Sequence, residues 1–413
     1  MYGTLQPVNE EVRARDDTPA GERGRAAAIV GVELFEAAVP LSSLARGAMA
    51  ESDNGLGMAL DSEEPWEVAD FLYCRLVDED GVEGWGEAYV WLPESGVSQT
   101  GLALAIREHL ARYVLGARPT DVQALAARLD RNVARNEMAK GVLDLACHDL
   151  AARQLGRPVH DLIGGATVER LPLCGLVPLG SPEFVSGIAA FHQEAGYGTV
   201  RIKLGTGPTE DRDVIAAVRE RCGDGLRIRV DYNQVHSAAS AARALALIEP
   251  YGIDAAEQPL RVADLLGMVD LQRRTTIPLF THEGFFTLAE AVALMEAGGM
   301  GVIGINLERP GGLTGALRAV DYAAARGLGT IIHNQPLGVG TAAHAHLAAA
   351  RWDRLGHVPE IAGDVMFDEH LVVERCAVED GHLVLPTGPG WGVEVDRDAL
   401  DDHLVNPPTS LTA

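Results

Sequence analysis

The segment TVRIKLGTGPTEDRDVIAAVRERCGDGLRIRVDYNQ (199–234) decides the fold of this chain. It begins and ends with short apolar and β-branched runs, 199–205 and 226–234, and a longer helical stretch lies between them. This order predicts a strand, a helix and a second strand, which is the unit from which parallel sheets are built.

The same alternation runs along the chain from about residue 170 onward. Eight strands are expected, at 171–179, 199–205, 226–234, 252–260, 277–284, 301–310, 329–336 and 355–363. One of the helices between them is expected at 313–325, where apolar residues fall on one face and Gly327 follows as a stop signal. Eight such strands in succession predict an α/β protein built on a TIM-type barrel.

The composition excludes several classes of function. The 413 residues include 34 Lys and Arg against 59 Asp and Glu, a formal net charge of −25, and no basic run interrupts this acidity. Phosphate backbones and anionic lipid headgroups repel such a chain, so we expect neither nucleic acid nor a membrane as a partner. Its five scattered cysteines form no CxxC, and it lacks a signal-like N-terminus and a long apolar run. We therefore expect a cytoplasmic protein.

Polar residues stand near the ends of seven of the expected strands. They recur every 23 to 28 residues and are Lys203, Asp231, Glu257, Glu283, Asn306, His333 and Glu360. A single residue of this kind is most often a helix cap or part of an ion pair. Because the strands of a parallel barrel all point the same way, the shared period predicts that these side chains meet at one mouth and form a site.

Three of these residues are carboxylates on consecutive strands. Asp231, Glu257 and Glu283 would repel one another at close range unless a cation neutralised them, so we expect a divalent metal. Ligation by oxygen alone favours Mg²⁺, with Mn²⁺ as the second choice.

Two basic residues share the strand before the first carboxylate. Arg201 and Lys203 are two residues apart, so both side chains point to the same face, and their mutual repulsion favours a neutral lysine that acts as a general base. The alternative for Lys203 is an ion pair with the acidic cluster, whereas Arg201 stays charged and is expected to hold a substrate carboxylate. His333 approaches from the far side of the mouth as a second proton-transfer group.

The motifs in combination resemble those of the mandelate racemase/muconate lactonizing enzyme family of the enolase superfamily. They are GWGE (84–87), ACHDLAARQLGRPVHDLIGG (146–165), VRIKLG (200–205), VDYNQ (230–234), AAEQP (255–259), THEG (281–284), RPGGLTGA (309–316) and PGWGVEVD (389–396). The resemblance covers the chain from about residue 27 to the C-terminus.

This resemblance implies a (β/α)₇β barrel at 166–375, an N-terminal α+β capping domain at 26–165, and a C-terminal segment, 376–413, that packs on the cap. Residues 1–25 are polar and are expected to form a flexible tail. The resemblance further implies Mg²⁺ held by Asp231, Glu257 and Glu283, with Lys203 removing the α-proton of a small carboxylate substrate through an enediolate. It also implies substrate contacts from Asn233 and Glu360, and homo-oligomers, either dimers or octamers.

One departure from the family pattern bears on the reaction. Asn306 stands where the family has an aspartate or a lysine, and an asparagine holds the ring of His333 without stabilising its charged form. Because His333 is then an acid or a weaker base, we favour dehydration of a hydroxy acid or acid sugar. A racemase or epimerase is the alternative, a cycloisomerase is third, and a binder of metal and carboxylate without turnover is the hypothesis from another class.

The cap is expected to supply the loop that recognises the substrate, at residues 41–60. Arg46 in this loop would meet a distal anion of the substrate. An incidental surface arginine is the equal alternative.

Overall fold

The computed structural model describes residues 27–50 and 66–413. The predicted tail at 1–25, and residues 51–60 of the predicted substrate loop, lie outside these ranges. No helix within them combines the length and apolar character that crossing a membrane requires.

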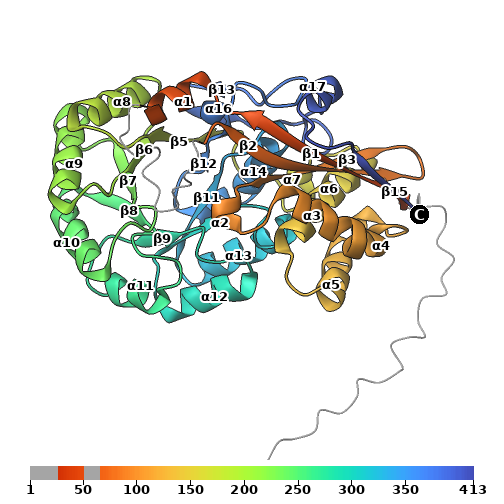
Figure 1. Ribbon diagram of the computed structural model, residues 1–413, viewed down its shortest axis with the longest axis horizontal. Coiled ribbons are helices and arrows are strands. Elements are labelled where there is room, and N and C mark those ends of the chain that lie inside the picture. Colours follow the sequence, from red (N-terminus) through yellow and green to blue (C-terminus); the bar gives the residue numbers. More distant parts are fainter. Residues whose placement is uncertain (1–26, 51–65) are drawn as a thin grey trace, which may run out of the picture.

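Eight parallel strands follow one another in chain order around a barrel, with the last, β12, beside the first, β5 (Figure 1). They are β5 (Cys174–Val177), β6 (Thr199–Lys203), β7 (Arg227–Asp231), β8 (Ile253–Glu257), β9 (Leu279–Thr281), β10 (Val302–Ile305), β11 (Gly329–Asn334) and β12 (Glu360–Ile361). Each lies within its predicted range, so the predicted TIM-type barrel is confirmed.

Helices surround this barrel on the outside. They are α8 (Pro182–Glu194), α9 (Pro208–Cys222), α10 (Ala238–Ile248), α11 (Leu265–Gln272), α12 (Leu288–Ala297), α13 (Leu313–Ala325) and α14 (Gly338–Ala350), with the short α15 (Trp352–Leu355) and α16 (Gly363–Met366) near the end. The helix predicted at 313–325 is α13. Local sequence begins several of them: Thr287 and Glu290 form a reciprocal capping box at α12.

Alternation along the strands separates the inside of the barrel from the outside. Ala255, Phe280, Val302 and Ile331, one from each of β8 to β11, form a buried cluster that contains no helix residue. Their neighbours, such as Ala256 and Leu279, pack instead with residues of the surrounding helices. Because side chains on a strand alternate, residues two positions beyond the inner cluster also point inward, at the carboxyl mouth of the barrel.

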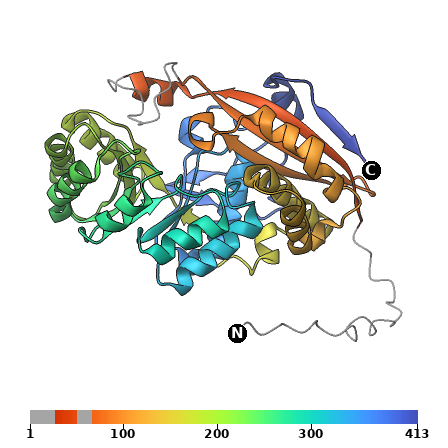
Figure 2. The ribbon, with the colours of Figure 1, turned by 60° about the horizontal axis from the view of Figure 1, so that its bottom comes forward.

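The N-terminal part forms an antiparallel sheet with helices, coloured red to yellow in Figure 1, beside the barrel (Figure 2). Its strands are β1 (Ile29–Pro40), β2 (Val68–Asp78) and β3 (Glu83–Val90), and the C-terminal β15 (Thr409–Thr412) pairs with β1. A second small sheet joins β4 (Arg170–Pro172), β13 (Val378–Glu379) and β14 (His382–Val384). The helices are α1 (Ser43–Ala50), α2 (Leu92–Ser95), α3 (Gln99–Ala105), η2 (Ile106–Leu110), α4 (Ala111–Val114), α5 (Val122–Asn132), α6 (Glu137–Gln154) and α7 (Val159–Leu162).

Strand β3 lies directly on the backbone of α6. A Cβ atom at Gly86 would stand 2.1 Å from the carbonyl oxygen of Val142, so only glycine permits this approach. Asp149 of α6 then ties three segments together. It accepts hydrogen bonds from the backbone N–H of Trp85 in β3 (2.8 Å) and of Trp391 near the C-terminus (2.7 Å).

Glu87 of β3 joins the cap to the barrel. Its carboxyl group accepts hydrogen bonds from the Tyr73 hydroxyl (3.0 Å) and from the backbone N–H of Leu337 (2.7 Å) and Gly340 (2.9 Å), at the start of α14. Burial, opposed by these hydrogen bonds, raises the pKa of Glu87 from 4.5 to about 7.

This raised pKa predicts a pH dependence of stability. Between pH 4.5 and about 7 the folded protein keeps the Glu87 proton that the unfolded chain releases, so the free energy of unfolding falls as pH rises through this window. The difference in unfolding free energy between wild type and Glu87→Gln should therefore fall by up to about 1.4 kcal/mol per pH unit there. Urea titrations at several pH values measure it, and a difference that does not change with pH would contradict the prediction.

Candidate active site

The carboxyl ends of the barrel strands bring five of the predicted side chains together. Lys203 on β6 lies opposite Asp231 on β7, which lies opposite Glu257 on β8. Farther round the barrel, His333 on β11 lies opposite Glu360 on β12. All five residues are buried, so their charges interact where the screening by water is weak.

The two cations of β6 contact the nearest carboxylates. Arg201 Nη1 lies 2.6 Å from Asp231 Oδ2 and 3.2 Å from Glu257 Oε2. Arg201 Nε lies 3.0 Å from a carboxylate oxygen of Glu360. Lys203 Nζ lies 2.5 Å from the same Asp231 oxygen. The ion pair that the sequence leaves open as the alternative role of Lys203 is present in this arrangement.

The turn after β7 has a strained backbone. Asn233 and Gln234 both have positive φ angles, 41° and 67°, which residues other than glycine rarely adopt. This turn directs Asn233 Oδ1 to accept a hydrogen bond from Lys203, and directs Gln234 Nε2 to donate one to Glu283 Oε1 (2.8 Å). Strain of this kind collects at functional sites, where the surrounding contacts hold it.

His333 is held by Glu360 and not by Asn306. His333 Nε2 lies 3.2 Å from Glu360 Oε1, and its Nδ1 atom is buried without a hydrogen-bond partner. The predicted contact from Asn306 is replaced by a hydrogen bond that Asn306 donates to Asn334 Oδ1 (3.3 Å). Burial and the neighbouring His282 lower the pKa of His333, although Glu360 opposes this. Despite its own burial, the pKa of Glu360 is lowered to about 2 by Arg201 and His333.

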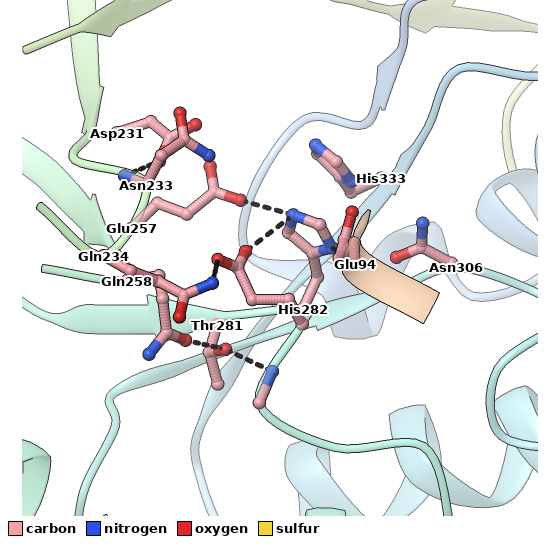
Figure 3. Close-up of polar contacts among 12 residues, drawn as sticks. Glu94, Asp231, Asn233, Gln234, Glu257, Gln258, Thr281, His282, Asn306 and His333 are labelled. Atoms are coloured by element: carbon pink, nitrogen blue, oxygen red, sulfur yellow. Dashed lines mark hydrogen bonds and ion pairs between the residues drawn. The ribbon is translucent and has the colours of Figure 1, made fainter. Parts of the chain in front are cut away.

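His282 occupies the centre of the site, and sequence reasoning missed it (Figure 3). Its Nε2 atom lies 2.9 Å from Glu257 Oε1 and 3.1 Å from Glu283 Oε2, and its ring stacks on that of His333 at 4.0 Å between centroids. Burial lowers the pKa of His282 to about 4. Alternation of side chains along the strand could have predicted its place in the site, because Phe280 faces the barrel interior and His282, two residues later, points to the same side.

Arg309 and Glu94 were also missed. Arg309, the first residue of the RPGG motif, places Nη1 2.5 Å from Glu94 Oε1 and 3.1 Å from His282 Nδ1. Glu94 belongs to α2 of the cap and lies 3.2 Å from the same His282 nitrogen. Arg309 was within a motif that the sequence analysis quoted. Glu94 lies in the cap, so the regular spacing of the barrel strand ends does not include it.

A pocket at this mouth is lined by both parts of the molecule. Tyr89, Trp91 and Glu94 come from the cap, and Lys203 and His333 are among the barrel residues. Arg46, predicted to meet a distal anion, is exposed on α1 and is not among the residues that line this pocket.

Two domain families match this sequence over most of its length. "Enolase C-terminal domain-like" matches residues 183–399, and "Mandelate racemase / muconate lactonizing enzyme, N-terminal domain" matches residues 62–164. The chain belongs to the mandelate racemase/muconate lactonizing enzyme family of the enolase superfamily.

Similar members of the family include several isomerases. N-succinyl-L-Arg/Lys racemase of Bacillus cereus is 26% identical over 81% of this chain and 90% of its own. Muconate cycloisomerase 1 of Pseudomonas putida is 28% identical over 80% and 89%, and L-Ala-D/L-Glu epimerase of Clostridium acetobutylicum is 28% identical over 78% and 90%.

Solved structures agree on the fold. The crystal structure of the Bacillus cereus N-succinyl Arg/Lys racemase superposes with a TM-score of 0.83 at 24% identity, over 93% of this chain and all of the other. That of muconate lactonizing enzyme from Pseudomonas fluorescens, complexed with muconolactone, gives 0.82 at 25% identity, over 92% and 100%. The predicted family and barrel-and-cap fold are therefore confirmed.

Enzymes of this family generally use a divalent metal, and the charges at the mouth fit one. Contacts of 3.2 Å or less join ten side chains, here called the mouth cluster: Glu94, Arg201, Lys203, Asp231, Glu257, His282, Glu283, Arg309, His333 and Glu360. Five carboxylates face three basic side chains, Arg201, Lys203 and Arg309, so two negative charges are in excess when every acid is ionised and every base is protonated. A dication would balance them.

Without such a cation, the cluster must hold protons. Burial and the neighbouring Asp231 raise the pKa of Glu257 to about 7, although Arg201 opposes this. Burial, together with Glu94 and the other carboxylates, raises the pKa of Glu283 well above its ordinary value. The sequence predicts Asp231, Glu257 and Glu283 as the metal ligands. In the structure Asp231 pairs with Arg201 and Lys203, whereas His282 Nε2 contacts Glu257 and Glu283, so His282 joins the candidate ligands.

Proposed function

We propose that this enzyme inverts the configuration at the α-carbon of a carboxylate substrate, as a racemase or epimerase. One observation carries the proposal. Lys203 and His333 line the same pocket, from strands β6 and β11, which stand three strands apart across the closure of the barrel. Inversion requires a proton-transfer group on each face of the substrate, and the presence of two such groups at one pocket supports this assignment.

The chain's use of lysine supports the assignment of a base. Only two lysines occur in the whole sequence, Lys140 and Lys203, and every other basic position among the 34 is an arginine. Arginine stays protonated in proteins, whereas a lysine is able to release its proton and accept another. A site that needed only a positive charge would be served by arginine, as it is at Arg201 and Arg309.

The residues would then divide the reaction as follows. Lys203, when it has lost a proton and is neutral, takes the α-proton from one face of the substrate. Protonated His333 delivers a proton to the opposite face. In the reverse reaction the two residues exchange these roles. Glu360, in contact with the His333 ring, supports its charged form. A bound divalent metal would supply positive charge against the second negative charge that develops on the substrate carboxylate.

Dehydration, which the sequence favours, is the second candidate. It needs one base and one acid that expels water, and the Glu360 carboxylate, 3.2 Å from His333 Nε2, opposes the loss of a proton from such an acid. Cycloisomerisation comes third and is suggested by the muconate cycloisomerases among the relatives. All three reactions break or form a C–H bond at the α-carbon of a carboxylate, whereas a binder would leave that carbon untouched.

Proton exchange in D₂O distinguishes these reactions. The purified enzyme, supplied in turn with Mg²⁺, Mn²⁺ or Co²⁺, is incubated with single stereoisomers of N-succinyl amino acids, dipeptides and α,β-dihydroxy acids, and with cis,cis-muconate. We expect deuterium at the α-carbon, seen by proton NMR, together with the opposite stereoisomer, seen by chiral chromatography. A keto acid or a lactone formed without inversion would overturn the racemase proposal, and an absence of exchange with every compound would favour the binder.

A further inference from the structure

The donor atoms at the mouth include a nitrogen where the sequence predicts oxygen alone. His282 directly follows the fifth barrel strand, β9, two residues after the inward-facing Phe280, and its Nε2 atom contacts the carboxylates of both Glu257 and Glu283. We propose that this site binds a transition-metal dication through His282 Nε2 and Glu257, in preference to Mg²⁺. The role of the metal rests on the proposed function, but the preference for one metal over another is measured by binding alone, without a catalysed reaction.

The distances match those between neighbouring ligands of one ion. Nitrogen and oxygen ligands about 2.1 Å from a metal stand about 3 Å apart when they occupy adjacent octahedral positions. His282 Nε2 lies 2.9 Å from Glu257 Oε1 and 3.1 Å from Glu283 Oε2. Neither contact has hydrogen-bond geometry, and both carboxylate oxygens are buried without a hydrogen-bond partner. Two such oxygens directed at one nitrogen are an arrangement that a shared cation would stabilise.

Two sets of three potential metal donors occur among the described residues, and His282 belongs to both. One adds Glu257 and His333, and the other adds Glu94 and Glu283. Glu94 is already paired with Arg309 at 2.5 Å, and His333 contacts Glu360 at 3.2 Å. Glu257 is the first partner of His282 through Oε1, because Arg201 contacts only its Oε2 atom, and Glu283 is the nearest third donor that no cation contacts.

The nitrogen ligand decides the class of metal. Mg²⁺ prefers oxygen ligands and water, whereas imidazole suits Fe²⁺, Ni²⁺ and Zn²⁺, and affinities for mixed nitrogen and oxygen sites rise from Mn²⁺ through Co²⁺ to Ni²⁺. His282→Asp would restore an all-oxygen set and should return the preference toward Mg²⁺.

The test compares metal affinities of the full-length protein after removal of bound metal with a chelator. Calorimetry with Mg²⁺ and with Co²⁺ should give a dissociation constant at least about 100-fold lower for Co²⁺ in wild type. In His282→Asp that ratio should fall at least about tenfold. With Mn²⁺ bound, pulsed EPR should show coupling to an imidazole nitrogen in wild type and lose it in His282→Asp.

Two controls address folding and residue identity. His236→Asn removes a histidine from the loop between β7 and α10 that belongs to neither donor set, and it should keep both the affinity ratio and the nitrogen coupling. Thermal melts of the proteins without metal show whether each variant folds, and His282→Asn provides a second variant should His282→Asp fail.

The outcomes are separable from those of the proposed function. Equal affinity for Mg²⁺ and Co²⁺, nitrogen coupling that persists in His282→Asp, or no divalent binding at all would each overturn the metal assignment. In the last case His282 bridges the carboxylates by itself. Co²⁺ selectivity that depends on His282, in a protein that exchanges no α-proton, would uphold the metal assignment and overturn the proposed reaction.

Discussion

Lys203→Arg is expected to slow stereochemical inversion by about 10³-fold while leaving the protein folded. Arginine keeps the positive charge that pairs with Asp231 at 2.5 Å in the wild type, but it does not give up its proton near neutral pH. The substitution therefore preserves the ion pair and removes the base. Chiral chromatography measures the rate of inversion, and a thermal melt confirms that the fold is retained.

The matched control is the other lysine. Lys140 is also buried and paired with an aspartate, Asp130, at 2.8 Å, but it belongs to the cap, so Lys140→Arg should retain the wild-type rate. Retention of inversion within tenfold by Lys203→Arg would show that Lys203 serves as an ion pair alone.

Exchange without inversion gives a second readout. In Lys203→Arg, the stereoisomer whose α-proton faces His333 should still exchange that proton with D₂O, because His333 is unchanged and still able to remove and return it. His333→Asn should show the mirror image of this behaviour. A merely structural loss would slow the exchange of both stereoisomers equally.

Asp149→Ala is expected to destabilise the protein by about 3–5 kcal/mol. The side chain is fully buried, accepts the backbone N–H groups of Trp85 and Trp391, and pairs with Arg153 Nε at 3.0 Å. Its removal leaves two buried backbone donors without their acceptor and takes one of two carboxylate partners from Arg153, which keeps Glu394 at 2.7 Å. Urea and thermal unfolding measure the loss.

Two variants calibrate this prediction. Asp149→Asn keeps the shape and one acceptor oxygen, so it should cost less than Asp149→Ala. Asp270→Ala, which breaks a pair with Arg273 whose two side chains are 65% and 70% exposed, should cost no more than about 1 kcal/mol. A similar loss in Asp149→Ala and Asp270→Ala would show that Asp149 does not hold the three segments together.

Asp149 connects three of the motifs that carry the family resemblance. GWGE, ACHDLAARQLGRPVHDLIGG and PGWGVEVD lie in β3, in α6 and its continuation, and near the C-terminus, and one carboxylate bonds to the backbone of the other two. Sequence alone showed that each motif was present. Their convergence depends on hydrogen bonds across 64 and 242 residues, which no local pattern encodes.

The barrel itself was predictable because its signal is local. Alternation of short apolar runs with helical stretches placed all eight strands, and the stop at Gly327 placed the end of α13 within two residues. Polar residues near strand ends identified Lys203, Asp231, Glu257, His333 and Glu360 as neighbours, since parallel strands carry equivalent ends to one mouth.

By itself, then, the sequence determined which segments become strands and at which end of the barrel the chemistry lies, because both follow from spacing within one βα unit. Only the tertiary structure decided which side chains fill the centre of the mouth. His282 enters because the pleat of β9 is set by the packing of Phe280 inside the barrel, and Glu94 enters because the cap carries it to Arg309 across more than two hundred residues. The direction in which a side chain points and the contacts between two domains depend on the tertiary fold of the whole chain, and the repeating pattern of strands and helices does not encode them.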